Sequence, residues 1–285
     1  MRKLIALDVD GTLLTSKHEM TDVNRQAIKS AQEKGHVVMI CSGRAPESVR
    51  EMLKEIDVDC PFAASNGAVV CVEEEMLSEI NLSSEQIEMI SNVLDLEKMP
   101  YRLYTNLGVY EMPDWKMRVE RIINSGKVPE EYKQDERFEL LLERPQSYKE
   151  VTYYNDIDEL RNIKGLTIQK FFVLTLDPNQ KKKLNEQLQR IDNIGVTTSG
   201  VHNIEIMSKN AHKGYGIQVM AKHFNIDMKD TVAIGDNYND MPMFKTAGLS
   251  VAMENAEEEI KEYCDVVTLS NDENGVAHAF HTYIF

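Results

Sequence analysis

The chain lacks a long apolar run, and this absence limits where the protein can work. Its 285 residues include no uncharged apolar stretch long enough to cross a bilayer. Arg2 and Lys3 lie near the start, but Asp8 follows before the apolar core of a signal peptide could develop. We therefore expect a cytoplasmic protein with no membrane partner.

Cysteine is also scarce. The four cysteines are scattered, and no Cys-x-x-Cys pair occurs among Cys41, Cys60, Cys71 and Cys264. Zinc sites and disulfide frameworks need closely and regularly spaced cysteines. The pattern is therefore typical of reduced thiols that serve as small, mostly buried apolar side chains.

Basic residues are in the minority. Lys and Arg number 32 against 47 Asp and Glu, so the formal net charge is −15 at pH 7. Extended nucleic-acid binding usually needs a basic face, and the composition argues against such a partner. Anionic small substrates stay open, because a bound cation and a few lysines can reverse the local field of an acidic protein.

The first and last thirds of the chain alternate between apolar strands and helices. Thr21 is an expected N-cap for a helix whose apolar stripe is Val23, Ala27, Ile28 and Ala31. Repeated strand–helix units of this kind predict a parallel sheet covered by helices on both faces. We predict strands at residues 4–8, 37–41, 62–64, 231–234, 249–252 and 266–268, and helices at 213–224, 240–246 and 256–263.

The middle third has a less regular order. Ser83 and Gln86 have the spacing of a capping box, and Asp177 followed by Pro178 predicts the start of another helix. Strand-like segments lie between these helices without strict alternation. That arrangement favours a separate α+β domain over more of the parallel sheet.

These two patterns together define the domain organisation. The strand–helix alternation returns after the middle third, so the irregular part interrupts one α/β domain. We therefore predict a Rossmann-like parallel-sheet core made of residues 1–81 and 206–285. The inserted α+β domain is expected to comprise residues 82–205.

Two carboxylates stand where the first predicted strand ends. Asp8 and Asp10 follow an apolar run that begins at Leu4, and Gly11 then allows a sharp turn. Because side chains alternate along a strand, Asp8 and Asp10 begin on the same side. Such a pair suits a hard divalent cation, and one carboxylate could act as a nucleophile. An ordinary Asp-x-Asp-Gly turn is the other interpretation of this pattern.

An EF-hand loop is a further alternative for the same segment. Glu19 lies at the twelfth position counted from Asp8, where such a loop has its last calcium ligand. That loop also requires Gly at its sixth position, where this chain has Leu13, and a helix before it. An apolar strand precedes Asp8 instead, so the pattern argues against an EF-hand.

Further polar residues follow other predicted strands or open a helix. They are Ser42, Gly43 and Arg44 after the second strand, Asp236 after the fourth, and Lys213 at a helix start. In open parallel sheets, ligands gather beyond the carboxyl ends of the strands, so these residues can converge with the two aspartates. The Ser hydroxyl and nearby backbone N–H groups suit an oxyanion. Taken singly, the same residues also fit a plain loop, a helix-capping Asp and a solvated lysine.

Together, four motifs resemble those of the haloacid dehalogenase (HAD) superfamily of phosphatases. In chain order they are Asp8-Val9-Asp10-Gly11-Thr12, Ser42-Gly43-Arg44, Lys213-Gly214, and Gly235-Asp236-Asn237-Tyr238-Asn239-Asp240. Three further segments resemble those of Cof-type members of this superfamily. They are Ser65-Asn66-Gly67-Ala68, Ile204-Glu205-Ile206-Met207 and Gly248-Leu249-Ser250-Val251-Ala252-Met253. The insertion looks like their class IIB cap, and the resemblance covers essentially the whole chain.

The resemblance implies a division of roles between the two aspartates of the first motif. Asp8 is expected to attack the phosphorus and become a phosphoaspartate, whereas Asp10 protonates the leaving alcohol and then activates water. Asp8, the backbone carbonyl of Asp10 and Asp236 are expected to hold Mg²⁺. A cation is needed because a carboxylate that attacks an anionic phosphate is otherwise repelled.

The resemblance also implies which residues surround the phosphoryl group. Ser42 and Lys213 are expected to bind its oxygens, and Lys213 also neutralises Asp8. Ser42 stands where relatives more often have Thr, a change that keeps the hydroxyl. Asn239 and Asp240 are expected to orient these residues. The expected substrate contacts are Ser42, Gly43, Arg44, Asn66, Lys213 and Asn239.

Several functions are compatible with these motifs. The leading expectation is a Mg²⁺-dependent phosphatase of small phosphorylated metabolites, such as sugar phosphates, nucleotides or cofactor phosphates. A phosphomutase or phosphotransferase would use the same aspartyl phosphate, and an intact Asp10 fits both. A non-catalytic phosphate-binding regulator would usually have lost Asp8 or Asp10, and this chain has kept both. We expect a monomer or a weak homodimer.

Overall fold

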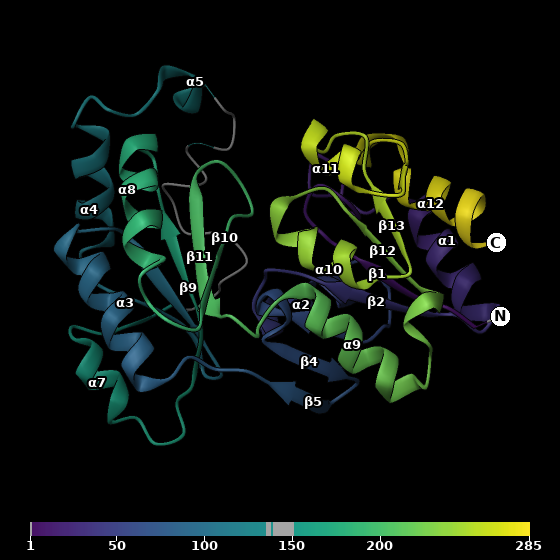
Figure 1. Ribbon diagram of the computed structural model, residues 1–285, viewed down its shortest axis with the longest axis horizontal. Coiled ribbons are helices and arrows are strands. Elements are labelled where there is room, and N and C mark those ends of the chain that lie inside the picture. Colours follow the sequence, from purple (N-terminus) through teal and green to yellow (C-terminus); the bar gives the residue numbers. More distant parts are fainter. Residues whose placement is uncertain (1, 135–137, 139–150) are drawn as a thin grey trace. The chain divides into compact units, whose positions relative to one another are not determined.

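The chain forms two compact units, each with a sheet and a hydrophobic core of its own. This computed structural model describes residues 2–134, 138 and 151–285. The core unit comprises Met1–Glu79 and Ala211–Phe285, and the cap unit comprises Ile80–Asn210 (Figure 1). No helix in these described ranges is long and apolar enough to cross a membrane.

An eight-stranded sheet forms the centre of the core unit. Its strands are β1 (Leu4–Leu7), β2 (Val37–Cys41), β3 (Phe62–Ala64), β4 (Val69–Val72), β5 (Glu75–Glu79), β12 (Thr231–Gly235), β13 (Leu249–Ala252) and β14 (Val266–Val267). They lie in the order β14-β13-β12-β1-β2-β3-β4-β5, and neighbours from β14 to β3 are parallel. The predicted parallel sheet is therefore confirmed.

An antiparallel extension of this sheet was not predicted. β3 pairs antiparallel with β4, and β4 pairs antiparallel with β5 at the edge of the sheet. β5 has the sequence Glu-Met-Leu-Ser-Glu, which contains no apolar run that would indicate a strand. The strand is only partly buried. The hairpin therefore depends on pairing with β3 rather than on a local pattern.

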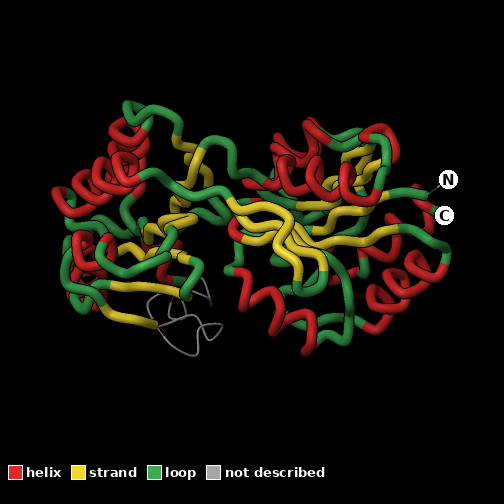
Figure 2. The backbone as a smooth tube through the Cα atoms, turned by 90° about the horizontal axis from the view of Figure 1, so that it is seen from below, coloured by secondary structure: helices red, strands yellow, loops and turns green. Residues whose placement is uncertain are grey.

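Helices cover both faces of the core sheet (Figure 2). They are α1 (Asp22–Glu33), α2 (Pro46–Glu55), α9 (Lys213–Phe224), α10 (Met241–Thr246), α11 (Glu258–Tyr263) and α12 (Gly275–Ala279), followed by the π-helical turn Phe280–Ile284. Alternate β1 residues join opposite cores: Ile5 packs in the cluster with α1, α2 and α12, and Leu4 packs in the cluster with α9, α10 and α11. Burial on both faces explains why β1 and β2 are uniformly apolar.

Helix α1 confirms the predicted cap but corrects one residue of its apolar stripe. Thr21 accepts a hydrogen bond from the Asn24 N–H and caps the helix. Val23 is 50% exposed, whereas Asn24 is fully buried. The Asn24 amide donates to the Leu13 carbonyl at 3.4 Å and accepts from the Ala277 N–H at 3.0 Å. Because these backbone groups satisfy it, a polar residue occupies the buried position.

The cap unit is built on a six-stranded sheet. Its strands are β6 (Tyr101–Thr105), β7 (Gly108–Glu111), β8 (Val151–Tyr153), β9 (Ile168–Leu174), β10 (Ile194–Thr197) and β11 (Asn203–Ser208). The order is β10-β11-β9-β6-β7-β8, and every pair is antiparallel except β7–β8. The described helices of this unit are α3 (Ser84–Leu96), α4 (Trp115–Ile123), α5 (Glu130–Lys133), α7 (Ile157–Arg161) and α8 (Pro178–Leu188). This is the expected α+β insertion.

Both predicted helix starts in the cap unit are confirmed. The Ser83 hydroxyl accepts from the Gln86 N–H at 3.2 Å, and the Gln86 side chain accepts from the Ser83 N–H at 2.9 Å. Asp177 accepts from the N–H groups of Asn179 and Gln180 and caps α8. Side chains at these caps replace hydrogen bonds that the first helical turn cannot make itself.

Both limits of the cap unit differ from the predicted ones, by two residues at the first boundary and by five at the second. We predicted boundaries at 81/82 and 205/206, and the units divide at 79/80 and 210/211. The predicted second boundary lies inside β11, which pairs with β9 and β10 along its length. A strand that continues without a break gives no local signal of where one unit ends, because that depends on its pairing partners.

Candidate active site

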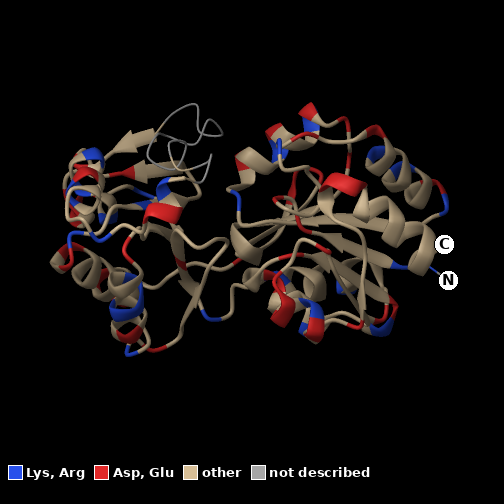
Figure 3. Ribbon diagram, turned by 90° about the horizontal axis from the view of Figure 1, so that it is seen from above, with Lys and Arg blue, Asp and Glu red and all other residues tan. Residues whose placement is uncertain are grey.

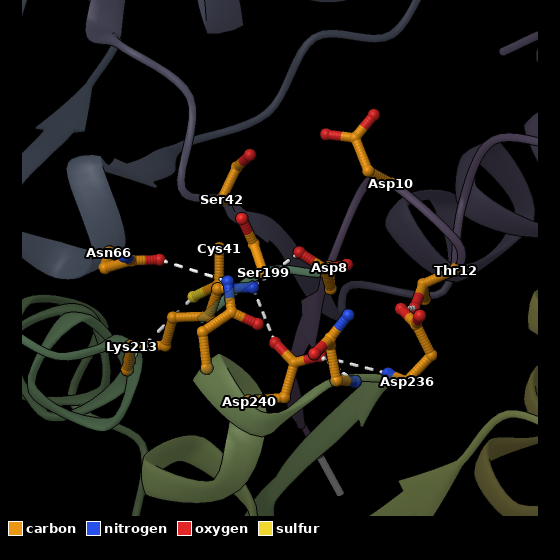
Figure 4. A network of polar contacts seen from close by, with 12 residues as sticks. Asp8, Asp10, Thr12, Cys41, Ser42, Asn66, Ser199, Lys213, Asp236 and Asp240 are labelled. Atoms are coloured by element: carbon orange, nitrogen blue, oxygen red, sulfur yellow. Dashed lines mark hydrogen bonds and ion pairs between the residues drawn. The ribbon is translucent and has the colours of Figure 1, made fainter. Parts of the chain in front are cut away.

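Three neighbouring strands of the core sheet end beside one another, and a predicted site residue follows each. β1 lies between β2 and β12 and is parallel to both. Asp8 follows β1, Ser42 follows β2 and Asp236 follows β12. The Asp8 N–H donates to the Ile234 carbonyl at 3.0 Å, which extends the pairing one residue beyond β1. The structure therefore brings these residues to one edge of the sheet (Figure 4).

Lys213 is the buried cation of this cluster. Its Nζ lies 2.5 Å from Asp8 Oδ1 and 2.5 Å from Asp240 Oδ1 (Figure 4). It stands in the first turn of α9, where His212 Nδ1 accepts from the Tyr215 N–H at 3.0 Å and caps the helix. Burial by itself lowers the pKa of Lys213, but the carboxylates of Asp240 and Asp8 hold it above its ordinary value. The side chain is therefore a charged ammonium away from water.

Asp240 ties this cluster to the loop after β12. Its Oδ1 accepts from Lys213, and its Oδ2 accepts from the backbone N–H groups of Asp236 at 3.0 Å and Asn237 at 2.9 Å. The residue is fully buried at the end of the 3-10 turn Tyr238–Asp240. Both of its carboxylate oxygens are engaged by protein donors, which suits a residue that orients its neighbours.

Asp236 is held by the loop that follows β1. Thr12 Oγ1 donates to Asp236 Oδ1 at 2.7 Å. Gly11 has a left-handed φ of +85°, and a Cβ at this position would clash with the Asp236 carboxylate. Burial and then the negative charge of Asp240 raise the pKa of Asp236 to about 7. The first motif therefore positions Asp236 as well as carrying Asp8.

The donor set at this edge fits a hard divalent cation. Carboxylate oxygens of Asp8, Asp236 and Asp240 lie within 4.8 Å of one another. Burial and then the charge of Asp240 raise the pKa of Asp8 well above its usual range, and Lys213 offsets only part of the negative charge. Oxygen ligands with uncompensated negative charge are what Mg²⁺ prefers. Because protein donors engage both Asp240 oxygens, Asp8 and Asp236 are the carboxylates left for a cation.

Asp10 and Arg44 are paired, although we predicted separate roles for them. Arg44 Nε lies 2.9 Å from Asp10 Oδ2 and Arg44 Nη2 lies 2.5 Å from Asp10 Oδ1. His18 Nδ1 lies 3.6 Å from the same carboxylate. Partial removal from water raises the pKa of the Asp10 carboxyl, but hydrogen bonds from His18 and Arg44 hold it well below its usual range. The Asp10 side chain is 47% exposed and points away from Lys213 (Figure 4).

The remaining predicted residues lie in three loops that contact one another. Ser42 is buried, and its hydroxyl accepts from the Arg44 N–H at 3.2 Å, with Gly43 between them. The Ser42 carbonyl accepts from the Asn66 N–H at 2.9 Å. Asn239 Nδ2 donates to Asn66 Oδ1 at 3.3 Å. The structure thus links the loops after β2, β3 and β12 at the same edge of the sheet.

Sequence reasoning missed several contacts around the first motif. Thr12 lies within the motif, so its place after the Asp-Gly turn was a usable signal for a structural role. His18 beside Asp10 and Asn255 beside Gly11 had no such signal. The Asn255 amide reaches the Gly11 carbonyl at 2.9 Å only because the fold brings distant loops together.

The family of the chain follows from its match to known proteins. Residues 5–280 match the haloacid dehalogenase-like hydrolases, and the chain belongs to this family. The resemblance carried by the four motifs is therefore confirmed. The parallel-sheet core with an inserted α+β cap is also the architecture expected from that resemblance.

Two phosphatases of Bacillus subtilis (strain 168) are similar to the chain over nearly its full length. The 5-amino-6-(5-phospho-D-ribitylamino)uracil phosphatase YwtE is 32% identical over 280 residues, which cover 97% of this chain and 96% of YwtE. Phosphatase YwpJ is 31% identical over 286 residues, which cover 97% of this chain and 98% of YwpJ. Together with the family match, these relatives identify the chain as a phosphoric monoester hydrolase.

Solved structures agree on the fold. A haloacid dehalogenase-like hydrolase from B. subtilis has a TM-score of 0.86 and 28% identity, and the alignment covers 99% of this chain and 100% of that one. The HAD subclass IIB sugar phosphatase BT4131 has a TM-score of 0.79 and 22% identity, with 99% and 98% coverage. The second likeness concerns the fold alone, and it includes the class IIB cap.

Proposed function

We propose that the protein hydrolyses small phosphorylated metabolites with Mg²⁺ through a phosphoaspartate on Asp8. The observation that carries this proposal is the buried ion pair between Lys213 and Asp8, which lies in a carboxylate cluster at the carboxyl edge of the sheet. A carboxylate placed beside a buried ammonium can approach an anionic phosphoryl group with less repulsion. Among the carboxylates of Asp8, Asp236 and Asp240, only Asp8 has both a lysine partner and an oxygen that no protein donor described above engages.

The metal would be held by Asp8, Asp236 and the backbone carbonyl of Asp10. When bound, Mg²⁺ supplies positive charge to the phosphoryl oxygens during the displacement. Asp236 is suited to this role because Thr12 fixes one of its oxygens. Asp240 keeps Lys213 and the loop after β12 in place.

The reaction we propose has two displacements at phosphorus. Asp8 attacks, the bond from phosphorus to the substrate oxygen breaks, and the leaving alcohol takes a proton from Asp10. Asp10 then removes a proton from water, which attacks the phosphorus of the acyl phosphate and releases inorganic phosphate and free Asp8. Throughout, Lys213 and the Ser42 hydroxyl contact phosphoryl oxygens, together with Gly43, Arg44 and Asn239.

The pair formed by Arg44 and Asp10 implies a rearrangement before chemistry. As the structure stands, Asp10 accepts two hydrogen bonds from Arg44 and its carboxylate points away from the ion pair of Asp8. A bidentate guanidinium suits a phosphoryl group as well as it suits a carboxylate. We propose that the substrate competes for Arg44 and so releases Asp10 to act as acid and then base.

The substrate class rests on the relatives and on the charge of the site. YwtE acts, by its name, on a phosphorylated ribityl compound. Sugar phosphates, nucleotides and cofactor phosphates share the phosphoric monoester that the proposed residues contact. Acidic and basic residues are interspersed over the helices of both units (Figure 3). Because the charges of the helices are mixed, we assign phosphate binding to the residues of the proposed active site.

Turnover of an aryl phosphate tests the proposal. We expect phosphate release with Mg²⁺, none after chelation, and recovery when Mg²⁺ is restored. Asp8→Asn should be folded but inactive, whereas Asp227→Asn, which changes an exposed carboxylate of the same unit, should keep full activity. Equal release with and without chelator, or by Asp8→Asn, would contradict the proposal.

A further inference from the structure

A strained turn lies behind the proposed site. Ser65, Asn66 and Gly67 have successive positive φ values of 49°, 56° and 88°, and all three residues are buried. Left-handed backbone is unfavourable for a residue such as Ser, and it persists only where the surroundings hold it. Three such residues follow β3 directly. We therefore expect contacts with neighbouring segments to hold this turn in its conformation.

The turn contacts the other loops of the site. The Ser65 N–H donates to the Arg44 carbonyl at 2.8 Å, and the Asn66 N–H donates to the Ser42 carbonyl at 2.9 Å. A Cβ on Gly67 would clash with the carbonyl of His212, the residue that caps α9. The turn is therefore packed between the Ser42 loop and the start of the helix that carries the buried lysine.

An amide pair extends these contacts to the fourth motif. Asn239 Nδ2 donates to Asn66 Oδ1 at 3.3 Å, and the two residues are 6% and 1% exposed. Among the described residues, Asn239 Oδ1 is buried without a hydrogen-bond partner. A buried acceptor left unpaired is unfavourable, and at a functional site it needs an explanation. The bond to Asn66 holds Asn239 in the orientation that leaves this acceptor unpaired.

We infer that Asn66 is a positioning residue that acts through the side chain of Asn239. Its backbone N–H holds the Ser42 loop, and its amide oxygen holds the amide of Asn239. It thereby sets the spacing of the loops after β2 and β12, on either side of the phosphoryl group. This inference rests on the proposed function and changes the expected role of Asn66, since the residue then acts without touching the reacting atoms.

A substitution by glycine at position 66 can separate the role of the Asn66 backbone from the role of its side chain. Asn tolerates a left-handed φ better than most residues with a side chain, and Gly tolerates it fully. Asn66→Gly therefore keeps the turn and the N–H bond to Ser42 while removing only the amide. Asn225 supplies a matched control, because it is also left-handed, with a φ of 53°, and is exposed at the opposite end of α9.

A double-mutant cycle tests the inference. The four proteins are the native chain, Asn66→Gly, Asn239→Ala and the double variant, with Asn225→Gly as control. For Asn66→Gly we expect kcat/KM for an aryl phosphate to fall about tenfold, and competitive inhibition by inorganic phosphate to weaken in parallel. The double variant should be no worse than Asn239→Ala, because Asn66 acts through Asn239. Asn225→Gly should match the native chain, and all melting temperatures should lie close together.

Three results would overturn the inference. One is an Asn66→Gly variant with native kcat/KM and native phosphate inhibition. Another is a double variant whose loss equals the product of the two single losses. The third is an Asn66→Gly variant that does not fold, since its amide would then stabilise the fold rather than position Asn239. Turnover by Asp8→Asn would instead contradict the proposed function, so the two failures are distinguishable.

Discussion

Each charged side chain in the site depends on the others for its burial. Lys213 and Asp240 have no exposed surface, and Asp8 is nearly buried, so none of the three is stabilised by water. A buried charge is tolerated only when a partner of opposite sign is at hydrogen-bonding distance. The geometry that suits phosphoryl transfer is therefore also a condition for folding of this edge of the sheet.

Replacing Lys213 should cost both activity and stability. Lys213→Met leaves Asp8 and Asp240 buried without their cation, and we expect loss of turnover and a fall in unfolding free energy of about 3–5 kcal/mol. Urea denaturation at neutral pH measures the second effect. Lys222→Met changes an exposed lysine on the same helix and should leave both quantities nearly unchanged. Equal stability of the two variants would refute the dependence on Lys213.

Replacing Asp10 should affect proton transfer more than metal binding. Asp10→Asn keeps the backbone carbonyl proposed to contact Mg²⁺ and removes the carboxyl group proposed to exchange a proton. We expect turnover to fall by about 10²-fold or more, the usual scale for acid–base catalysis. The Mg²⁺ concentration for half-maximal activity should change little. Normal turnover at saturating Mg²⁺ with a much higher Mg²⁺ requirement would reverse this assignment.

Among the helices and strands, those determined by local sequence patterns could be predicted from the sequence. The buried runs of β1 and β2, the Thr21 and Asp177 caps and helix α9 all follow from apolar runs or capping residues within a few positions. The hairpin of β4 and β5 does not, because β5 is half-exposed and exists through its pairing.

The same distinction holds for the site. Strand ends and motifs indicate that Asp8 and Asp236 converge, because parallel strands present their ends to one edge. Nothing local predicts that Arg44 holds Asp10 or that Asn66 bonds to Asn239, since these are contacts between loops distant in sequence. The family resemblance indicates which residue types stand at these positions. Their hydrogen-bond partners can be identified only in the folded chain.

Helix α9 should lose stability in mild acid through its cap. His212 Nδ1 accepts from the Tyr215 N–H, so the cap needs a neutral ring, and burial lowers the pKa of His212. In the unfolded chain histidine takes up its proton near pH 6.5. Between that pH and the lower folded pKa, the unfolded state binds more protons, so the stabilisation is full above about pH 6.5 and is lost as the pH falls.

Thermal unfolding from pH 8 to pH 5 measures this effect. His212→Asn keeps a capping acceptor that does not titrate, so its stability should fall less than that of the native chain, by about 1 kcal/mol. His223→Asn, at an exposed position of the same helix, is the matched control and should follow the native profile. Parallel profiles for all three proteins would show that the His212 cap does not titrate in this range.

At the scale of the whole molecule, the proposed chemistry and the inserted unit are separate. All residues proposed to act on the phosphoryl group lie in Met1–Glu79 or Ala211–Phe285. The cap unit has an independent sheet and core, and it carries none of them. Varied specificity on a common scaffold is expected to come from such an insertion.

Exchange of the cap unit should change substrate preference and keep the chemistry. We propose a chimera in which a relative's cap replaces Ile80–Asn210, with junctions where the two units divide. Its order of preference in a panel of phosphate esters should move toward that of the cap donor, and Asp8→Asn should abolish turnover in the chimera too. A folded chimera that keeps the native order would place specificity in the core unit.

Capture of the covalent intermediate tests the proposed role of Asp8 most directly. The native protein is mixed with an aryl phosphate and Mg²⁺, quenched in acid, digested and analysed by mass spectrometry. We expect one added phosphoryl group on the peptide that contains Asp8, present in Asp10→Asn and absent in Asp8→Asn. A phosphoryl group on any other residue, or steady phosphate release by Asp8→Asn, would contradict this role.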